Sequence, residues 1–374
     1  MKICVIGAGP AGSFAAYLLA KAGHDVSLLE EHKEIGKPVQ CSGLVTQSIR
    51  KIDEIFSSAE FDNLVVNKIK KVRLYSRNNS VELELSESNV DLVLDRTSFD
   101  RYLATKAKEA GARVGSEIKF LNFEKVDDKF IIHVDHKGKT RKIEADVLIG
   151  ADGHFSSVAK SAGLKSLAAL PCIQADMEVK MPSDTMDIYF SSEFADLFAW
   201  IVPKNPSISE IGIGTSQNVG EKFNKFIQER EIKKMFLKHT GGPITLYNPL
   251  ETRYNEKEKI YIIGDAAGHV KATTLGGIIP SLRAAKALSS SLQNGTSFEK
   301  ETSELKKELD AHNRIRKILS KFSDADYDSL LEIVKKEKVK NILENESRDE
   351  FSNSKIIKLL FAAPSLLKFA SKAF

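Results

Sequence analysis

Cysteine is scarce in this chain of 374 residues, which contains Cys4, Cys41 and Cys172 alone. Three thiols so far apart in sequence are too few for a disulfide framework or a cysteine-based metal site, so no metal site is expected. Their odd number is typical of a reducing compartment. We therefore expect a cytoplasmic protein.

The chain also lacks a large excess of charge of one sign. It has 55 Lys and Arg residues and 51 Asp and Glu residues, which gives a net charge of +4. This charge is too small and too dispersed for a nucleic-acid partner, although it suits an anionic substrate or an anionic membrane surface. Residues 3–20 carry no charge, but glycines and a proline interrupt them, which argues against a signal peptide. No other stretch reaches the roughly 18 apolar residues of a membrane-spanning helix.

The remaining composition is that of a folded protein, with 42% hydrophobic and 28% charged residues. The length predicts two or three domains. Residues 2–7 predict a buried parallel strand, residues 13–23 a helix and residues 25–30 a second strand. This βαβ unit opens a doubly wound α/β domain.

Later segments predict further elements that are inserted between the strands of this first domain. Alternating patterns indicate antiparallel strands in residues 68–94 and 171–215. Helices are expected over residues 97–114 and about 221–239, and a largely helical segment from residue 298 onward.

The first strand runs directly into a glycine-rich motif at residues 7–12, GAGPAG. In a G-x-G-x-x-G motif the first glycine permits the tight turn, the second lets the backbone approach a pyrophosphate, and the third lets helix and strand pack closely. Glu30 ends the second strand, where a carboxylate accepts hydrogen bonds from ribose hydroxyls and repels the 2′-phosphate of NADP. The motif predicts a dinucleotide site without separating NAD from FAD; a glycine-rich turn in another α/β protein is the alternative.

Two further predicted strands end in acidic turns. Residues 145–153 (ADVLIGADG) place Asp152 after an apolar strand, and residues 260–268 (IYIIGDAAG) place Asp265 after another. Both turns are expected at the carboxyl ends of parallel strands, where such sheets bind ligands. Each motif alone is a common turn, but an acidic residue with small neighbours can accept a hydrogen bond from a ribityl hydroxyl. The three motifs in this order favour FAD.

With these motifs the sequence resembles the flavoprotein superfamily of p-hydroxybenzoate hydroxylase, which has the glutathione-reductase-like FAD fold. Within it the chain is similar to the geranylgeranyl reductase family, including archaeal digeranylgeranylglycerophospholipid reductases. Three segments carry this similarity: residues 34–44 (EIGKPVQCSGL), 94–103 (LDRTSFDRYL) and 264–278 (GDAAGHVKATTLGGI). The family's three consecutive glycines are Leu275-Gly276-Gly277 here.

The resemblance implies an α/β fold: an FAD-binding Rossmann domain, an inserted antiparallel-sheet substrate domain and a helical C-terminal region. The FAD-binding domain is expected to comprise residues 1–65, 92–165 and 255–297. The substrate domain is expected to comprise residues 66–91 and 166–254. The helical C-terminal region is expected to comprise residues 298–374.

The motifs and the resemblance together assign the residues that hold FAD. The expected cofactor-binding residues are Gly7, Gly9, Ala11, Gly12, Glu30, Cys41, Ser42, Leu44, Arg96, Asp152, Asp265, Gly277 and Ile278. Cys41 is also the expected catalytic residue, because a thiol in a loop beside the flavin can position the substrate or deliver a proton. The alternative for Cys41 is a small residue that packs against the ring, and for Arg96 a surface arginine at a helix start.

The resemblance also implies a substrate strand with the pattern Pro-x-x-Tyr-x-Trp-x-Phe-Pro. Here this strand begins at Ala195 and matches strictly at Trp200 and Pro203, while Phe198 replaces the tyrosine and Val202 the phenylalanine. Phe198, Trp200 and Pro203 are the expected substrate residues. Phe198 and Trp200 line an apolar slot for an isoprenoid chain, or else they belong to an ordinary sheet core.

The resemblance implies an FAD-dependent reductase that hydrogenates isolated double bonds of geranylgeranyl chains in archaeal ether lipids, using a hydride from reduced flavin and a proton. An FAD-dependent monooxygenase or halogenase is one alternative, since FAWIVP at residues 198–203 is similar to the halogenase pattern Trp-x-Trp-x-Ile-Pro. A non-catalytic, membrane-associated flavin or prenyl carrier is the other. No second nucleotide motif is present, so NAD(P)H, ferredoxin and a deazaflavin all remain open as electron donors.

The C-terminal residues 355–374 contain four lysines, no acidic residue and many Leu, Ile and Phe. A basic amphipathic segment of this kind can lie on an anionic membrane, which would place the protein on the inner membrane face. The alternative is a docked helical subdomain with a solvated lysine face.

Overall fold

The computed structural model describes residues 1–232, 236–349 and 353–373, which divide into two compact units. The first unit comprises Met1–Val39, Arg96–Ala169 and Thr245–Leu309. The second unit comprises Gln40–Asp95, Leu170–Ile244 and Asp310–Phe374. Residues 40–65 therefore cluster with the second unit, although we expected them in the FAD-binding domain; the expected domain boundaries stay a prediction.

The first unit is built on a six-stranded sheet. Its strands, in spatial order, are β18 (Tyr254–Asn255), β19 (Ile260–Ile262), β12 (Val147–Gly150), β1 (Lys2–Ile6), β2 (Asp25–Leu29) and β8 (Arg113–Gly115). All neighbours pair parallel except β18 with β19. The chain proceeds from β1 to β2 on one side and places β12 on the other, so the strand order reverses beside β1. Sheets of this class bind ligands at such a switch point.

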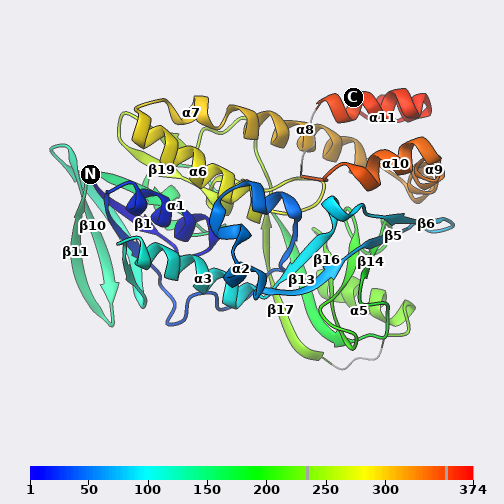
Figure 1. Cartoon of the computed structure of the whole chain (residues 1–374), viewed down its shortest axis with the longest axis horizontal. Helices are drawn as coiled ribbons and strands as arrows, with labels where there is room; N and C mark the ends of the chain where they lie inside the picture. Colours follow the sequence, from blue (N-terminus) through cyan, green and yellow to red (C-terminus); the bar gives the residue numbers. More distant parts are fainter. Residues whose placement is uncertain (233–235, 350–352, 374) are drawn as a thin grey trace. The chain divides into compact units, whose positions relative to one another are not determined.

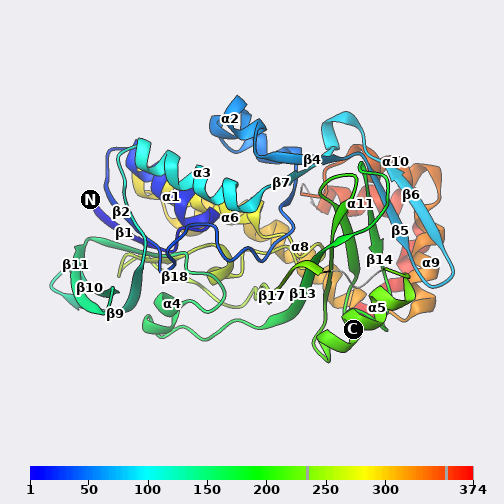
Figure 2. The ribbon, with the colours of Figure 1, turned by 90° about the horizontal axis from the view of Figure 1, so that it is seen from below.

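Helices cover one face of this sheet and a second sheet covers the other (Figure 2). The central helix α1 (Pro10–Lys21) contacts both α3 (Arg96–Glu109) and α6 (Ile278–Asn294). The second sheet is the antiparallel meander β9 (Ile118–Val126), β10 (Lys129–His136) and β11 (Lys139–Ala145), seen in Figure 1 near the N-terminus. Further elements of this unit are α4 (Ser157–Ser161), the 3-10 turn η4 (Gly264–Ala267) and α7 (Phe298–Glu301).

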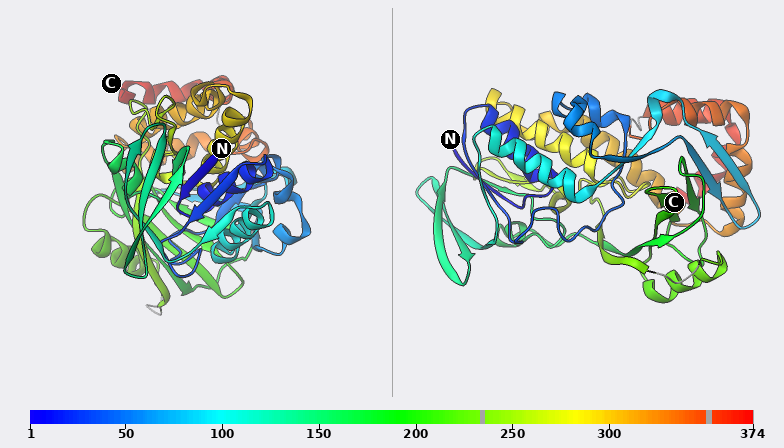
Figure 3. Two further views of the ribbon diagram at one scale, coloured as in Figure 1. Left: turned by 90° about the vertical axis from the view of Figure 1, so that its left-hand side faces the viewer. Right: turned by 60° about the horizontal axis from the view of Figure 1, so that its bottom comes forward.

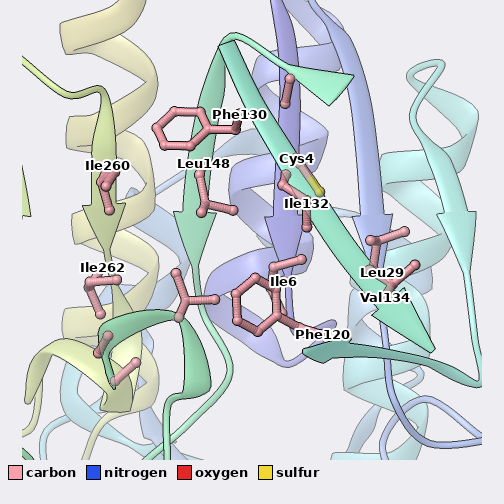
Figure 4. Close-up of a cluster of buried hydrophobic side chains, with 14 of the residues drawn as sticks. Cys4, Ile6, Leu29, Phe120, Phe130, Ile132, Val134, Leu148, Ile260 and Ile262 are labelled. Carbon is pink, nitrogen blue, oxygen red and sulfur yellow. The ribbon is translucent and has the colours of Figure 1, made fainter. Parts of the chain in front are cut away.

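A cluster of buried hydrophobic side chains lies between the two sheets of the first unit (Figure 4). Phe130 and Ile132 of β10 pack against Cys4 of β1 and Leu148 of β12. Strand residues two apart share one face of a sheet, so Cys4 and Ile6 point into this core together. Cys4 is therefore a buried core residue, and burial raises the pKa of its thiol to about 12.

The second unit contains a seven-stranded and a three-stranded sheet. The larger sheet has the order β17 (Phe236–Thr245), β13 (Ala169–Glu178), β16 (Ile208–Gly214), β15 (Ala199–Pro203), β14 (Thr185–Tyr189), β5 (Lys71–Tyr75) and β6 (Ser80–Glu84). The smaller has the order β3 (Leu44–Thr46), β7 (Asp91–Leu94) and β4 (Val65–Ile69). Strands β13, β16, β15 and β14 pair antiparallel in turn, and β14 pairs parallel with β5.

Helices occupy both faces of the larger sheet. On one face, α5 (Val219–Glu229) packs Phe223 and Phe226 against Ile201 and Ile211. The C-terminal helices lie together near β6 (Figures 1 and 3). Their apolar side chains form a cluster of their own. These helices are α8 (Ser303–Leu319), whose first residues belong to the first unit, and α9 (Asp324–Val334), α10 (Glu337–Asn345), α11 (Asn353–Ala362) and η5 (Pro364–Ala373).

The remaining elements of the second unit are short: η1 (Gln47–Lys51), η2 (Glu54–Ser57), α2 (Ala59–Asp62) and η3 (Glu87–Asn89). Across the described ranges, no helix is both long and apolar enough to cross a membrane.

Two sequence-based expectations about these elements are wrong. The helix expected over about residues 221–239 ends at Glu229, because Glu231 adopts φ +53°, a left-handed conformation that ends helices. Residues 233–235 of the expected helix lie outside the described residues, and residues 236–239 belong to β17. Within residues 68–94, where we expected antiparallel strands, the alternating run 68–76 is not one strand but is divided between β4 and β5, which belong to different sheets.

Candidate functional site

The three motifs of the first unit meet at the carboxyl ends of β1, β12 and β19, and glycine makes the close approach possible. A Cβ atom on Gly7 would lie 2.4 Å from the Ala151 carbonyl oxygen, and one on Gly12 would lie 2.0 Å from the Gly7 carbonyl oxygen. A Cβ on Gly264 would lie 2.8 Å from the Cβ of Ala11. The structure therefore brings the predicted residues Gly7, Ala11 and Gly12 against both acidic turns.

Gly9 differs from these glycines, because a Cβ atom there would have no heavy atom of the described chain within 4 Å. Gly9 immediately precedes α1, whose first N–H groups and dipole favour a negatively charged group. An open glycine at a helix start fits the pyrophosphate of a dinucleotide. The first unit therefore has the cradle that FAD requires.

Glu30 follows β2, and its side chain is hydrogen-bonded to the glycine-rich turn. Its Oε2 accepts a hydrogen bond from the backbone N–H of Ala8 at 2.8 Å, and its Oε1 lies 2.6 Å from His32 Nδ1. The carboxylate thus lies beside the helix start, as a ribose acceptor would. Its contact with the cofactor stays a prediction.

Asp152 has local partners for both carboxylate oxygens. Oδ1 accepts from the Ser156 hydroxyl at 2.6 Å, and Oδ2 accepts from the Val158 N–H at 3.1 Å. Burial raises the pKa of Asp152, while these bonds oppose the rise. The side chain therefore holds the start of α4, and its cofactor contact stays a prediction.

Asp265, Arg96 and Gly277 come together on the other side of the cradle. Burial raises the pKa of Asp265, and the positive charge of Arg96 opposes this rise. Arg96 is held by two hydrogen bonds of 3.1 Å to the carboxylate of Asp100. Asp265 Oδ1 lies 2.9 Å from the position of a Cβ on Gly277, so glycine is required there, immediately before Ile278 begins α6.

Leu275 lies in the turn between Asp265 and Gly277 and adopts φ +59°. Glycine occupies this region readily, whereas for other residues it costs about 1–2 kcal/mol. Hydrogen bonds from Leu275 N to the Lys271 carbonyl (2.8 Å) and from Lys271 N to the Gly276 carbonyl (3.1 Å) hold the turn. Leu275 thus adopts a conformation that favours glycine, the residue that the family pattern has at this position.

His269 is a residue that the sequence did not place in the site. Its Nδ1 accepts a hydrogen bond from the Gly264 N–H at 3.2 Å, and burial lowers the pKa of the ring to about 4. The ring is therefore neutral near pH 7, and it holds the Gly264–Asp265 turn in place. In the sequence, the place of His269 directly after the GDAAG motif is the signal that could have indicated its role.

This arrangement predicts that acid destabilises the protein through His269. Its folded pKa of about 4 lies below the ordinary value, so the unfolded chain takes up the proton as the pH falls. Lowering the pH from 7 to 5 should cost about 2 kcal/mol of unfolding free energy at this residue. In His269→Asn, whose amide oxygen can replace Nδ1, denaturant titrations should show a smaller loss. An equal loss in both proteins would contradict this assignment, since the other histidines are common to both.

In the second unit, Cys41 and Ser42 lie in a loop that Gly43 fixes. The Gly43 N–H donates to Cys41 Sγ at 3.4 Å, and a Cβ on Gly43 would lie 2.2 Å from the Leu94 carbonyl oxygen. Leu44 then begins β3 and pairs with Val93. Cys41 is half-buried, and its thiol forms no disulfide.

The three predicted substrate residues lie on or next to β15 in the same unit. The rings of Phe198 and Trp200 are in edge contact, with centroids 6.0 Å apart. Trp200 lies over Gly212 of β16, where a Cβ would come within 2.1 Å of the indole. The Pro203 carbonyl accepts a hydrogen bond of 2.7 Å from the Asn67 amide. Their contact with substrate stays a prediction.

Trp200 also makes a long hydrogen bond of 3.5 Å from Nε1 to Glu210 Oε1. Glu210 was not among the predicted site residues. An acidic residue in an otherwise apolar, isoleucine-rich strand is uncommon, and this pattern could have indicated it.

Gly212 offers a direct test of the Trp200 position. Gly212→Ala should displace the indole, at a cost of about 1–3 kcal/mol from overpacking. Trp200 is the sole tryptophan of the chain, so its fluorescence reports on this site alone. The emission should shift and become more accessible to acrylamide, whereas Gly220→Ala, where a Cβ lies 3.9 Å from Ile173, should leave it unchanged. An unshifted spectrum in folded Gly212→Ala would contradict the packing.

Comparison with known proteins agrees with this geometry. A family model described as FAD binding domain matches residues 1–293. The chain is 30% identical to digeranylgeranylglycerophospholipid reductase of Methanocaldococcus jannaschii, over 98% of this chain and 96% of that protein. The chain belongs to the digeranylgeranylglycerophospholipid reductase family. This membership confirms FAD as the cofactor and an FAD-dependent oxidoreductase as the class of enzyme.

Solved structures share the fold of this reductase family member. A geranylgeranyl bacteriochlorophyll reductase-like protein from Thermoplasma acidophilum matches with a TM-score of 0.85 and 23% identity, over 100% of this chain and 99% of that chain. The flavin-dependent halogenase CmlS matches with a TM-score of 0.68 and 16% identity, over 99% of this chain and 77% of that chain. The expected fold class is confirmed, and the halogenase is the more distant of the two.

Proposed function

We propose that this protein reduces isolated double bonds in the geranylgeranyl chains of membrane ether lipids, as a step of phospholipid biosynthesis. The observation that carries the proposal is the match over nearly the whole chain to a reductase named for such a lipid. The apolar, aromatic face that bears Phe198 and Trp200 supports an isoprenoid substrate, because prenyl chains bind through apolar contact.

Bound FAD in its reduced form supplies a hydride, and the protein supplies binding, orientation and the proton. The Gly9 cradle and Glu30 hold the nucleotide end of the cofactor. Phe198 and Trp200 hold the prenyl chain away from water. The Cys41 thiol gives a proton to the second carbon of the double bond, since an isolated alkene has no acidic group of its own.

Anaerobic single turnover tests this function. Holoenzyme reduced with dithionite, which replaces the physiological donor (NAD(P)H, ferredoxin or a deazaflavin), is mixed with a geranylgeranylated ether lipid. Flavin reoxidation should accompany the gain of two hydrogen atoms per double bond, measured by mass spectrometry. Reoxidation that needs oxygen and yields hydroxylated product would favour the monooxygenase alternative, and no reoxidation by any prenyl lipid would favour the carrier.

We further propose peripheral binding of the second unit to an anionic membrane on its cytoplasmic side, where the lipid substrate lies. Phe361 of α11 is 83% exposed, and Ile357 and Leu367 are also exposed. Lysines accompany them, although Lys358 pairs with Glu346. Flotation with anionic vesicles but not with neutral vesicles, lost in Phe361→Asp, is the expected result.

A further inference from the structure

An arginine of α8, in the second unit, lacks the partner that a buried cation normally has. Arg316 is half-buried, and its Nη1 is buried without a hydrogen-bond partner among the described residues. Other half-buried arginines are paired, as Arg73 is with Asp187 and Arg96 with Asp100. A buried guanidinium without a counter-charge costs free energy. An unsatisfied donor of this kind requires an explanation, and an anionic ligand supplies one.

The face of α8 that bears Arg316 packs against aromatic side chains. Leu319 lies three residues after Arg316 and therefore on the same face of the helix. The Leu319 carbonyl accepts a hydrogen bond of 3.3 Å from the Tyr327 hydroxyl, and Leu319 packs in the apolar cluster that contains Tyr327 and Phe190. The buried Nη1 shows that the guanidinium of Arg316 points into the protein on this side.

A row of aromatic rings leads from this face to the predicted substrate residues. The rings of Tyr327 and Phe190 are stacked, with centroids 5.2 Å apart. Phe190 is in edge contact with Phe198 at 6.4 Å, and Phe198 with Trp200 at 6.0 Å. The row thus joins an apolar strand face, which suits a prenyl chain, to a helix face that carries a cation. A phospholipid has the same order of an apolar chain followed by an anionic head group.

The charges around Arg316 leave an excess of positive charge. Asp196 acts on Arg316 electrostatically, but its own carboxylate is already bound. Its Oδ1 accepts from the Thr215 hydroxyl and its Oδ2 from the Ser216 N–H, both at 2.8 Å. Lys222 Nζ donates to the same Thr215 hydroxyl at 3.1 Å. Two cations therefore accompany one carboxylate, and this balance attracts an anion.

We propose that Arg316 binds the phosphate group of the lipid substrate, while the prenyl chains of that lipid lie along the aromatic row. This inference rests on the proposed function. A guanidinium offers a phosphate two parallel N–H donors, which gives a bidentate contact. Arg316 is a binding residue, because the double bonds that are reduced lie in the chains and not in the head group. It selects phosphorylated prenyl lipids over neutral ones.

Lipid binding to the oxidised holoenzyme tests this site without turnover. The probes are a detergent-solubilised digeranylgeranylglycerol phosphate and the neutral digeranylgeranylglycerol, and the fluorescence of Trp200 reports their binding. Wild type should bind the phosphorylated lipid about 30-fold more tightly, within the range of a charge-assisted hydrogen bond. Arg316→Gln should lose this preference and keep its affinity for the neutral lipid. Arg316→Lys should keep part of the preference, because an ammonium group retains the charge but not the fork.

Inorganic phosphate separates a head-group site from a site for free phosphate. At the concentration of the lipid it should not compete, since the chains contribute most of the lipid affinity. Competition that is lost in Arg316→Gln would overturn the assignment to a lipid.

The matched control is Lys317→Gln, which removes the same charge from the next, exposed residue of α8. It should keep the preference, and an equal loss in both variants would overturn the proposal, because it indicates an effect of net charge alone. Equal weakening of both lipids in Arg316→Gln would also overturn it.

Unfolding by denaturant distinguishes a ligand site from a structural role. Arg316→Gln should be at least as stable as wild type, because an uncompensated buried charge is removed. A clear loss of stability would overturn the proposal. Reduced wild type that prefers the phosphorylated lipid but is reoxidised by neither lipid would support the phosphate site and overturn the proposed function alone.

Discussion

Replacing Gly9 with alanine is expected to leave the apoprotein folded and to weaken FAD binding by about 100-fold, or about 3 kcal/mol. A Cβ on Gly9 meets no described atom within 4 Å, and the backbone at φ −70° suits alanine. The methyl group would instead project into the space at the start of α1 that fits a pyrophosphate. Titration of apoprotein with FAD, followed by flavin fluorescence, measures the change.

Gly12→Ala is the informative comparison for this prediction. Its Cβ would lie 2.0 Å from the Gly7 carbonyl oxygen, so this variant should lose unfolding free energy as well as FAD. Gly9→Ala should change the unfolding free energy of the apoprotein by no more than about 1 kcal/mol, the cost of alanine at a helix N-cap. Wild-type FAD affinity in Gly9→Ala would show that the cofactor does not pass this residue.

Replacing Cys41 with alanine is expected to lower the rate of flavin reoxidation by prenyl lipid by about 10²- to 10⁴-fold, the usual size of an acid–base contribution. FAD content should not change, because Gly43 and its packing against Leu94 set the loop and remain in place. Anaerobic single turnover measures this step without the physiological electron donor.

The matched control for Cys41 is Cys4→Ala, which removes a buried thiol from the core of the first unit. This variant should be less stable but should keep the reoxidation rate. If Cys41→Ala at full FAD occupancy reoxidises within a few-fold of wild type, Cys41 is a packing residue and not a proton donor.

The cofactor half of the site was predictable because its signals are local in sequence. The glycine spacing at residues 7–12 dictates a turn into a helix, and the strand before Glu30 places the carboxylate at the sheet edge. The two acidic turns follow strands whose apolar runs are unambiguous. Parallel pairing then brings all three motifs to one edge, as the contacts of Gly7, Gly12 and Gly264 show.

The substrate half was predictable only through Trp200 and its neighbours in sequence. The surroundings of Trp200 depend on the register between β15 and β16, which places the indole over Gly212. That register is a property of strand pairing and not of any short motif. The end of α5 was missed for a related reason, since Glu231 takes a left-handed conformation that a helical pattern does not reveal.

The interleaving of the two units has a consequence for the synthesis of this protein. Each unit is assembled from three segments, so the chain passes between them five times. Strand β19, which completes the parallel part of the first sheet, is synthesised some 250 residues after β1. The first unit therefore cannot be complete until residue 309 has been synthesised, and until β12 follows, one edge of the β1–β2 pair stays unpaired. A shortened gene that ends before residue 309 would yield no complete half of this protein, and expression of the FAD-binding unit alone would require three pieces joined anew.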